Sequence, residues 1–258
     1  MIDYDGRSWL PILFRMRGSV IPRLMPRVLA SAALGLLLVF RTNASYDRYW
    51  EGRRLLGFMV NRTRDLARQI GVYVADAEAR AELCRLVPAF YWVAAQTLRQ
   101  QDSLGNAERL LTAAQRTALA GTRFRGPVIT KWITDRLHAE AAAGRLSEAR
   151  LHVLDGNLTS LNDSLGGAER ILRTPIPFAY AQHIKIFVVL FCFSAPFVMA
   201  ADMGWATPAA CAALALALFG IDEIGVEIED PFGDDPNDLP LDAIGAGIEA
   251  AVGEIAAR

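Results

Sequence analysis

The sequence predicts an all-α fold that combines an integral membrane helical bundle with a large water-exposed helical region. Hydrophobic residues make up 53% of the 258 residues and charged residues 21%, a balance that suits neither a wholly membranous nor an ordinary soluble chain. Two uncharged apolar runs, 186–201 and 206–221, lie close together. A third stretch, 41–99, instead combines apolar residues at three- and four-residue steps with many arginines, which is typical of a helix packed sideways in water.

The N-terminal part, residues 1–40, contains an interfacial segment and a short apolar segment. Residues 1–27 mix aromatic, aliphatic and basic side chains, as membrane–water interfaces do, although a packed soluble helix has the same pattern. Asp3 and Asp5 argue against a cleavable signal. Residues 28–40 carry no charge, but they span only about 20 Å as a helix, less than the roughly 30 Å hydrocarbon core.

The central part, residues 41–177, is expected to be mainly cytosolic helix. One long helix is predicted from Arg41 to about Arg99, because no proline occurs before Pro88. Further helices are predicted over 128–143 and 146–171, with Ser147 as a candidate N-cap of the second.

The two apolar runs predict a hairpin over residues 178–221 that crosses a membrane and returns. A rigid proline-containing joint at 174–180 precedes them. A hairpin buried in a large soluble core is the alternative. The C-terminal part, residues 222–258, begins with many acids and ends in a short alanine- and glycine-rich helix, and we expect it to be cytosolic and to belong to the same single domain, 1–258.

No motif of an enzyme or of a cofactor site was found. The net charge of −1 offers no basic field to nucleic acid. His138, His152 and His183 do not have metal-ligand spacing, and the sequence contains no phosphate loop, dinucleotide fingerprint or nucleophile elbow. The three cysteines are odd in number and far apart, so they are interpreted as small buried hydrophobes. We therefore expect neither catalysis nor a cofactor.

Several ordered blocks carry a family resemblance that spans most of the chain. The blocks are GSVIPRLMPRVL at 18–29, FRTNASYDRYWEGRRLLG at 40–57, ERILRTPIPFAYAQHIKIFVVLFCFSAPF at 169–197, GWATP at 204–208, LFGIDEIGVEIEDPFG at 218–233 and NDLPLD at 237–242. Together they resemble the bacterial branch of the bestrophin family.

The resemblance implies a multi-pass protein of the cell membrane that assembles as a homopentamer around one axial pore. Family members have four membrane-spanning helices per subunit and a large cytosolic helical region. Animal and plant members conduct anions and a bacterial member favours cations, so the expected partners are the lipid bilayer and small inorganic ions, chloride or a monovalent cation. An apolar pore has no fixed charge that would indicate which.

The resemblance also implies a pore neck of apolar side chains on the second membrane helix. The family's neck ends at the phenylalanine that precedes the arginine of the second block, here Phe40, and four-residue steps back give Leu36 and Ala32. Such positions drift only about 80° around a helix, so they can line one face. A ring of apolar side chains forms a constriction from which water is readily expelled. Lipid contact or core packing is the alternative role.

Two further sites follow from the resemblance. A second constriction lies on the helix before the proline joint, with Leu158 and Leu161 as candidates, and ordinary core packing is an equal alternative. Asp234, Asp235 and Asp238 lie where animal members form a calcium clasp, but Pro236 and Asn237 interrupt the acidic run. A solvated turn without a bound metal is therefore the preferred interpretation.

The chain departs from the family between residues 28 and 36. There the end of one span, a loop and the start of the next are missing, so the fused segment crosses a membrane once at most. This leaves three or fewer complete spans and affects the outer pore, Ala32 above all. Two alternatives therefore stand beside an ion channel: a non-conducting membrane scaffold of the same family, and a soluble helical protein whose apolar runs form its core.

Overall fold

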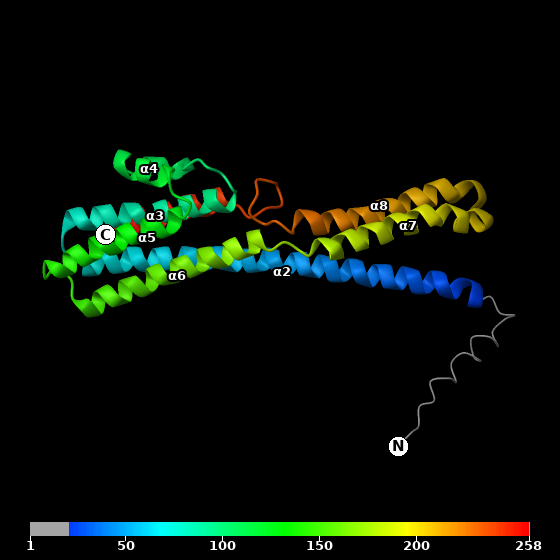
Figure 1. Cartoon of the computed structure of the whole chain (residues 1–258), viewed down its shortest axis with the longest axis horizontal. Helices are drawn as coiled ribbons and strands as arrows, with labels where there is room; N and C mark the ends of the chain where they lie inside the picture. The colour runs from blue at the N-terminus through cyan, green and yellow to red at the C-terminus, as the bar shows by residue number, and fades with distance from the viewer. Residues whose placement is uncertain (1–20, 258) are drawn as a thin grey trace, which may run out of the picture. The chain divides into compact units, whose positions relative to one another are not determined.

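A computed structural model of the chain describes residues 21–257, and every regular element in this range is a helix (Figure 1). This confirms the predicted all-α fold. The interfacial segment expected over residues 1–27 lies mostly outside the described residues. The elements are α2 (Ile21–Tyr73), α3 (Ala77–Leu98), η1 (Gly105–Leu110), α4 (Ala113–Ala120), α5 (Arg125–Ala142), α6 (Glu148–Arg173), α7 (Phe178–Met203), η2 (Gly204–Ala206), α8 (Thr207–Glu227) and α9 (Leu241–Ala257).

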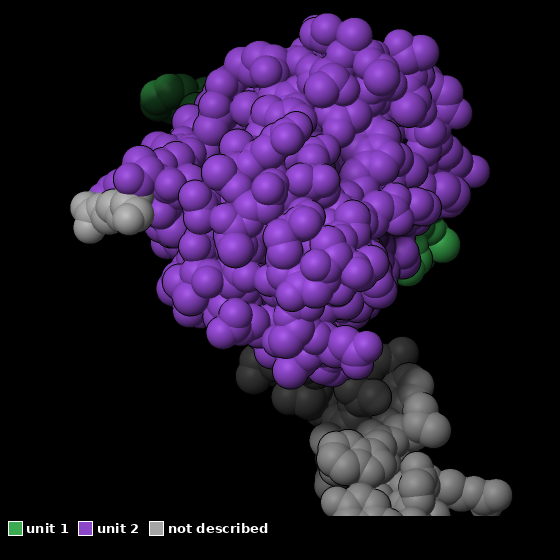
Figure 2. All heavy atoms as spheres, turned by 90° about the vertical axis from the view of Figure 1, so that its left-hand side faces the viewer, with its two compact units in different colours: residues 1–45, 176–226 green, residues 46–175, 227–258 purple. Residues whose placement is uncertain are grey.

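The chain forms two compact units, coloured green and purple in Figure 2. Unit 1 consists of Met1–Ser45 and Ile176–Val226, and unit 2 of Tyr46–Pro175 and Glu227–Arg258. Each unit is therefore assembled from two separate parts of the sequence. Helix α2 contributes its first half to unit 1 and its second half to unit 2.

Helices α7 and α8 form the predicted hairpin in unit 1. Their 26 and 21 residues correspond to lengths of about 39 and 32 Å, enough for each to cross a hydrocarbon core of roughly 30 Å. The chain reverses at Gly204, whose φ of 53° lies in the region that glycine adopts without a steric penalty. Cys211 Sγ of α8 lies 3.9 Å from Met199 Sδ of α7, so the two arms are in contact.

The surface of this hairpin is not that of a soluble core. Among the described residues, the stretch Phe178–Glu227 is the part long and apolar enough to span a membrane, and its most apolar 18-residue window has a mean hydropathy of 2.2. Only 17% of its most apolar window is buried within the chain. Large apolar side chains such as Phe193 and Phe197 are exposed. A soluble core helix would bury these side chains, so this observation argues against the soluble alternative.

Helix α3 forms the centre of unit 2 and packs against α5, α6 and α9. Almost every side chain along its second half is buried. Its two polar aromatic residues are satisfied: the Tyr91 hydroxyl donates to Leu241 O at 3.0 Å, and Trp92 Nε1 donates to Glu249 Oε2 at 3.1 Å. The C-terminal helix α9 is thus fixed to the core of unit 2 by hydrogen bonds as well as by apolar contact.

The prediction of one helix from Arg41 to about Arg99 is wrong at its middle. Helix α2 ends at Tyr73 and α3 begins at Ala77. The carboxylate of Asp76 accepts the backbone N–H of Ala79 at 2.7 Å and so caps the new helix, and this hydrogen bond lowers the pKa of Asp76. An aspartate side chain that bonds to the backbone at an N-cap competes with continuation of the preceding helix. The spacing of the apolar residues does not reveal this competition.

The other predicted helices lie close to their expected positions. Helix α5 begins three residues earlier than the predicted range and ends one residue earlier, and α6 is displaced by two residues toward the C-terminus. Ser147 occupies the N-cap position of α6, but its side chain makes no capping hydrogen bond. The segment between α3 and α5 contains two short helices, η1 and α4.

Close packing of α9 on α3 leads to a first prediction. A Cβ atom at Gly245 would lie 2.6 Å from Trp92 Cη2, well inside van der Waals contact, and the hydrogen-bonded Trp92 ring cannot easily move. We expect Gly245→Ala to lower the stability of the protein by about 1–3 kcal/mol, as overpacked cores do. Thermal unfolding in detergent measures this.

The matched control is Gly247→Ala on the same helix. No atom lies within 4 Å of a Cβ at that position. Alanine is favoured over glycine inside a helix by roughly 1 kcal/mol, so this variant should melt at the same temperature or higher. Equal melting temperatures for the two variants would contradict the packing assigned to Gly245.

Candidate functional site

The first half of α2 has a buried face that packs on the hairpin. Leu34 and Leu38 are almost wholly buried, and they form a small apolar cluster with Ile184 and Val188 of α7. Their four-residue spacing places both on one side of the helix. This contact determines which side of α2 is turned toward α7.

The three residues expected to form a neck lie on another side of α2. Leu36 and Phe40 are 55% and 54% exposed in the chain, and Ala32 is exposed as well. At about 100° per residue, Leu36 lies roughly 200° from Leu38, so the exposed face is turned away from the hairpin. A leucine and a phenylalanine one turn apart and half exposed form an apolar surface that this chain does not cover.

The candidates for a second constriction are placed differently. Leu158 and Leu161 of α6 are both buried in the main apolar cluster of unit 2. A side chain enclosed within its own subunit has no surface to offer to a pore between subunits. This burial favours the core-packing alternative for both residues.

Two of the three acids considered for a calcium clasp, Asp234 and Asp238, have protein partners. Asp234 forms an ion pair with Arg99 Nε at 2.8 Å, and the carboxylate of Asp238 accepts the backbone N–H of Asp235 at 2.8 Å. Burial raises the pKa of Asp238, and the neighbouring charge of Asp235 raises it further. Within residues 21–257 no group of three or more His, Cys, Asp or Glu side chains is placed to hold a metal ion.

The acidic loop after α8 packs against a glycine of α2. Phe232 is fully buried, and a Cβ at Gly52 would lie only 3.0 Å from Phe232 Cζ and 3.2 Å from Pro231 Cγ. The loop is closed by Leu239 N, which donates to Pro231 O at 2.9 Å. Two of the blocks that carry the family resemblance, one around Gly52 and one around Phe232, are therefore in direct contact.

Arg48 of α2 binds the C-terminus of α6 and the loop after α8. Its guanidinium donates to Ile171 O at 2.7 Å and to Thr174 O at the C-terminus of α6, and also to Glu229 O at 3.0 Å in the loop after α8. The last carbonyls of a helix have no partner within the helix, so an arginine that serves several of them is a structural anchor. Sequence reasoning did not identify this role.

A second contact missed by sequence reasoning lies in unit 1. The guanidinium of Arg41, directly after Phe40, forms an ion pair with the carboxylate of Asp222 in α8. Both side chains are buried, at 5% and 3% exposure. This pair adds α8 to the elements that hold the segment of α2 around Phe40.

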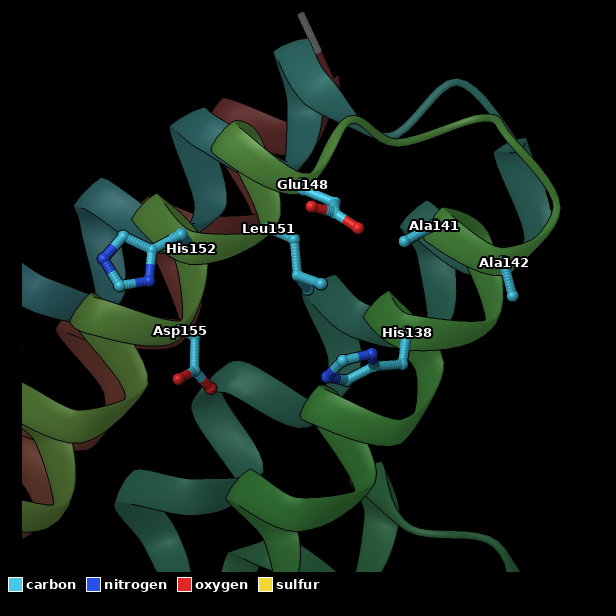
Figure 3. A pocket seen from close by; sticks show the side chains of 7 residues that line it. All are labelled: His138, Ala141, Ala142, Glu148, Leu151, His152 and Asp155. Carbon is cyan, nitrogen blue, oxygen red and sulfur yellow. The ribbon is translucent and has the colours of Figure 1, made fainter.

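Unit 2 also has a surface hollow of about 530 Å³ between α5 and α6 (Figure 3). The side chains of His138 and Glu148 point into it, with His152 and Asp155 at its edge. It is open to solvent, and its side chains do not form a metal site of the kind described above. It does not resemble an enclosed catalytic pocket.

The exposed apolar hairpin of unit 1, together with the all-helical fold, defines a helical membrane protein. Comparison with known proteins gives its family. Residues 24–254 match the family described as bacterial/fungal bestrophin protein. The chain belongs to this family, which confirms the resemblance noted from the sequence blocks.

Named relatives and solved structures support the same family assignment. A voltage-dependent anion channel-forming protein of Nostoc sp. is 39% identical, over 92% of this chain and 88% of the relative, and one of Synechocystis sp. is 38% identical over the same shares. The crystal structure of a bacterial bestrophin homologue from Klebsiella pneumoniae is similar with a TM-score of 0.86 and 31% identity, covering 91% of this chain and 88% of that one.

The role of Arg48 gives a second prediction. Arg48→Lys keeps the charge, but an ammonium group cannot reach three carbonyls as the planar guanidinium does. We expect a loss of stability of about 1.5–3 kcal/mol, the contribution of a hydrogen bond to a charged group. The measurement is thermal unfolding in detergent. Arg54→Lys, at an exposed position on the same helix, is the control and should unfold like the unaltered protein. Indistinguishable unfolding of the two variants would rule out the anchor.

The acidic loop gives a third prediction. Because Asp234 is already paired with Arg99 and Pro236 stiffens the turn, we expect no calcium binding in the micromolar range. Isothermal titration calorimetry with calcium chloride tests this. Micromolar binding that disappears in Asp235→Ala would prove the loop to be a calcium site.

Proposed function

We propose that this chain is one subunit of a pentameric bestrophin channel of the cell membrane that conducts anions passively along a central axis. The observation that carries the proposal is the exposed apolar face of α2, with Leu36 and Phe40 turned away from the hairpin. The membership of the bestrophin family and the names of relatives as anion channel-forming proteins support it. The pentamer is taken from the family resemblance. Passive conduction requires no catalytic group.

In this proposal α2 lines the pore, and Ala32, Leu36 and Phe40 of every subunit form the neck. Each level of the neck is a ring of five identical side chains, without charge and without hydrogen-bonding groups. An ion has to lose part of its hydration to pass such a ring, and water leaves a narrow apolar constriction readily. Opening therefore depends on the width of the ring at Phe40. Anion preference would then arise outside the neck, because an apolar ring carries no charge of either sign.

The exposed surfaces of the hairpin fit the lipid bilayer. Leu190, Phe197 and Leu216 present large apolar side chains to the outside of the chain. Trp205, at the turn between the arms, is almost fully exposed, and indole rings are enriched at membrane–water interfaces. Both arms are long enough to cross, so the proposal is a multi-pass protein.

A non-conducting scaffold of the same family is the second candidate. The alignment with the Nostoc relative is 271 residues long, whereas this chain has 258, so the relative contains residues without a counterpart here. In the structure, α2 runs without interruption from Ile21 through the neck. A missing outer hairpin would leave assembly intact and remove part of the pore mouth.

A liposome flux assay on the neck tests the proposal. We expect Phe40→Ala and Leu36→Ala to increase chloride efflux severalfold, because wider rings stay hydrated more of the time. Leu216→Ala is the matched control, since it removes an exposed leucine from α8 and should leave flux unchanged. Mass photometry on each preparation should give the mass of a pentamer.

Buried Leu38 provides a different control. Leu38→Ala removes contact with Ile184 and Val188 and should cost about 2–5 kcal/mol of stability rather than widen a pore. Equal flux through the neck variants and Leu216→Ala, with intact pentamers, would refute the neck. Pentamers without flux in any protein would favour the scaffold, and monomers alone would refute the assembly.

A further inference from the structure

The ion pair between Arg41 and Asp222 is unusual for its burial. The two residues are separated by 181 positions in the sequence, and both belong to unit 1. The pair formed by Arg99 and Asp234 in unit 2 leaves the carboxylate 63% exposed, whereas both partners are buried here. Transfer of two charges out of water costs several kcal/mol per ion, and an apolar pair of similar volume is often as stable. Stability alone therefore does not account for this pair.

Arg41 continues the buried face of α2. Leu34, Leu38, Arg41 and Ser45 are all buried and follow one another at steps of four, three and four residues, which is one side of a helix. The first two contact α7 and the third contacts α8. The exposed neck residue Phe40 is the immediate neighbour of Arg41, about 100° around the helix.

Helix α8 approaches α2 closely at this point. Gly225 is buried three residues after Asp222, and a Cβ at Gly225 would lie 3.9 Å from Arg41 Nε and 3.9 Å from Thr42 Oγ1. Both the charged group and the neighbouring glycine of α8 are thus turned toward the same turn of α2. The contact is specific in position, because a carboxylate can pair with Arg41 only while α2 keeps its present rotation.

Apolar contact alone holds a helix less strictly. Leu34 and Leu38 would lose contact gradually if α2 turned about its axis, since dispersion forces have no preferred direction. Rotation away from Asp222 would instead leave a charge unpaired in a buried site, at a much larger cost.

We propose that Arg41 and Asp222 are positioning residues for ion permeation: their ion pair fixes the rotation of α2 and so keeps Leu36 and Phe40 on the side turned away from the hairpin. The effect on permeation rests on the proposed channel function. The effect on rotation does not, and it can be measured separately. Without the ion pair, α2 turns and Leu38 leaves the hairpin.

Cysteine accessibility measures the rotation directly. Phe40→Cys and Leu38→Cys are introduced separately into a background in which Cys84, Cys192 and Cys211 are replaced by alanine. The assembled protein is treated with a charged, water-soluble thiol reagent. We expect fast labelling of Phe40→Cys and slow labelling of Leu38→Cys. Addition of Asp222→Asn should raise the labelling rate of Leu38→Cys about fivefold or more, the response to a small shift in conformational energy, and should lower that of Phe40→Cys.

Two comparisons separate positioning from general damage. Glu223→Gln removes the adjacent, exposed acid and should leave both labelling rates unchanged. The charge-reversed protein, Arg41→Asp with Asp222→Arg, restores the ion pair with its polarity exchanged and should restore both the labelling pattern and the flux. Unchanged labelling in an assembled Asp222→Asn protein would overturn the proposal. If Asp222→Asn does not assemble, the charge-reversed protein decides: restored assembly and labelling support the proposal, and their failure overturns it.

Flux through the same proteins in liposomes distinguishes this proposal from the channel itself. Altered labelling together with altered chloride efflux supports both. Altered labelling without flux in any protein, the unaltered one included, supports positioning and contradicts the channel. Altered flux with unchanged labelling overturns positioning and leaves the channel standing.

Discussion

Helix α2 has to present two different faces along the same few turns, and this constraint organises unit 1. The buried face carries Leu34, Leu38 and Arg41, while Leu36 and Phe40 lie on the exposed face. No residue can change sides without a rotation of the whole helix, because the backbone hydrogen bonds hold consecutive residues at about 100°. The contacts with α7 and α8 therefore determine the exposed surface as strictly as they determine the core.

The sequence was informative wherever the relevant pattern is local. Apolar length predicted the α7–α8 hairpin, and helical spacing predicted one shared face for Ala32, Leu36 and Phe40, which are all exposed. It failed at the break between α2 and α3, where one capping aspartate outweighs a continuous apolar period. For Leu161 it left two roles open, because periodicity identifies a helix face without indicating whether its own subunit covers that face, and this leucine is buried within the chain.

The contacts that sequence reasoning missed are those between distant parts of the chain. The sequence indicated only that Arg48 belongs to a family block. In the structure it donates hydrogen bonds to carbonyls more than a hundred residues away in the sequence, and Arg41 forms an ion pair with a residue that is similarly remote in the sequence. A lone arginine in a helix is compatible with solvent, lipid headgroups or a buried partner, and no spacing rule distinguishes these. The role of Gly52 likewise depends on a distant contact: the absence of a side chain leaves room for the ring of Phe232.

The alternation on α2 also limits how this helix can change its length during evolution. Insertion or deletion of one residue between Leu36 and Arg41 would turn the preceding segment by about 100° relative to Arg41 and move Leu36 toward the hairpin. Changes of seven residues nearly preserve both faces, since two turns return to almost the same direction. Length differences among homologues should therefore accumulate outside the segment from Leu34 to Ser45, in which both faces are defined.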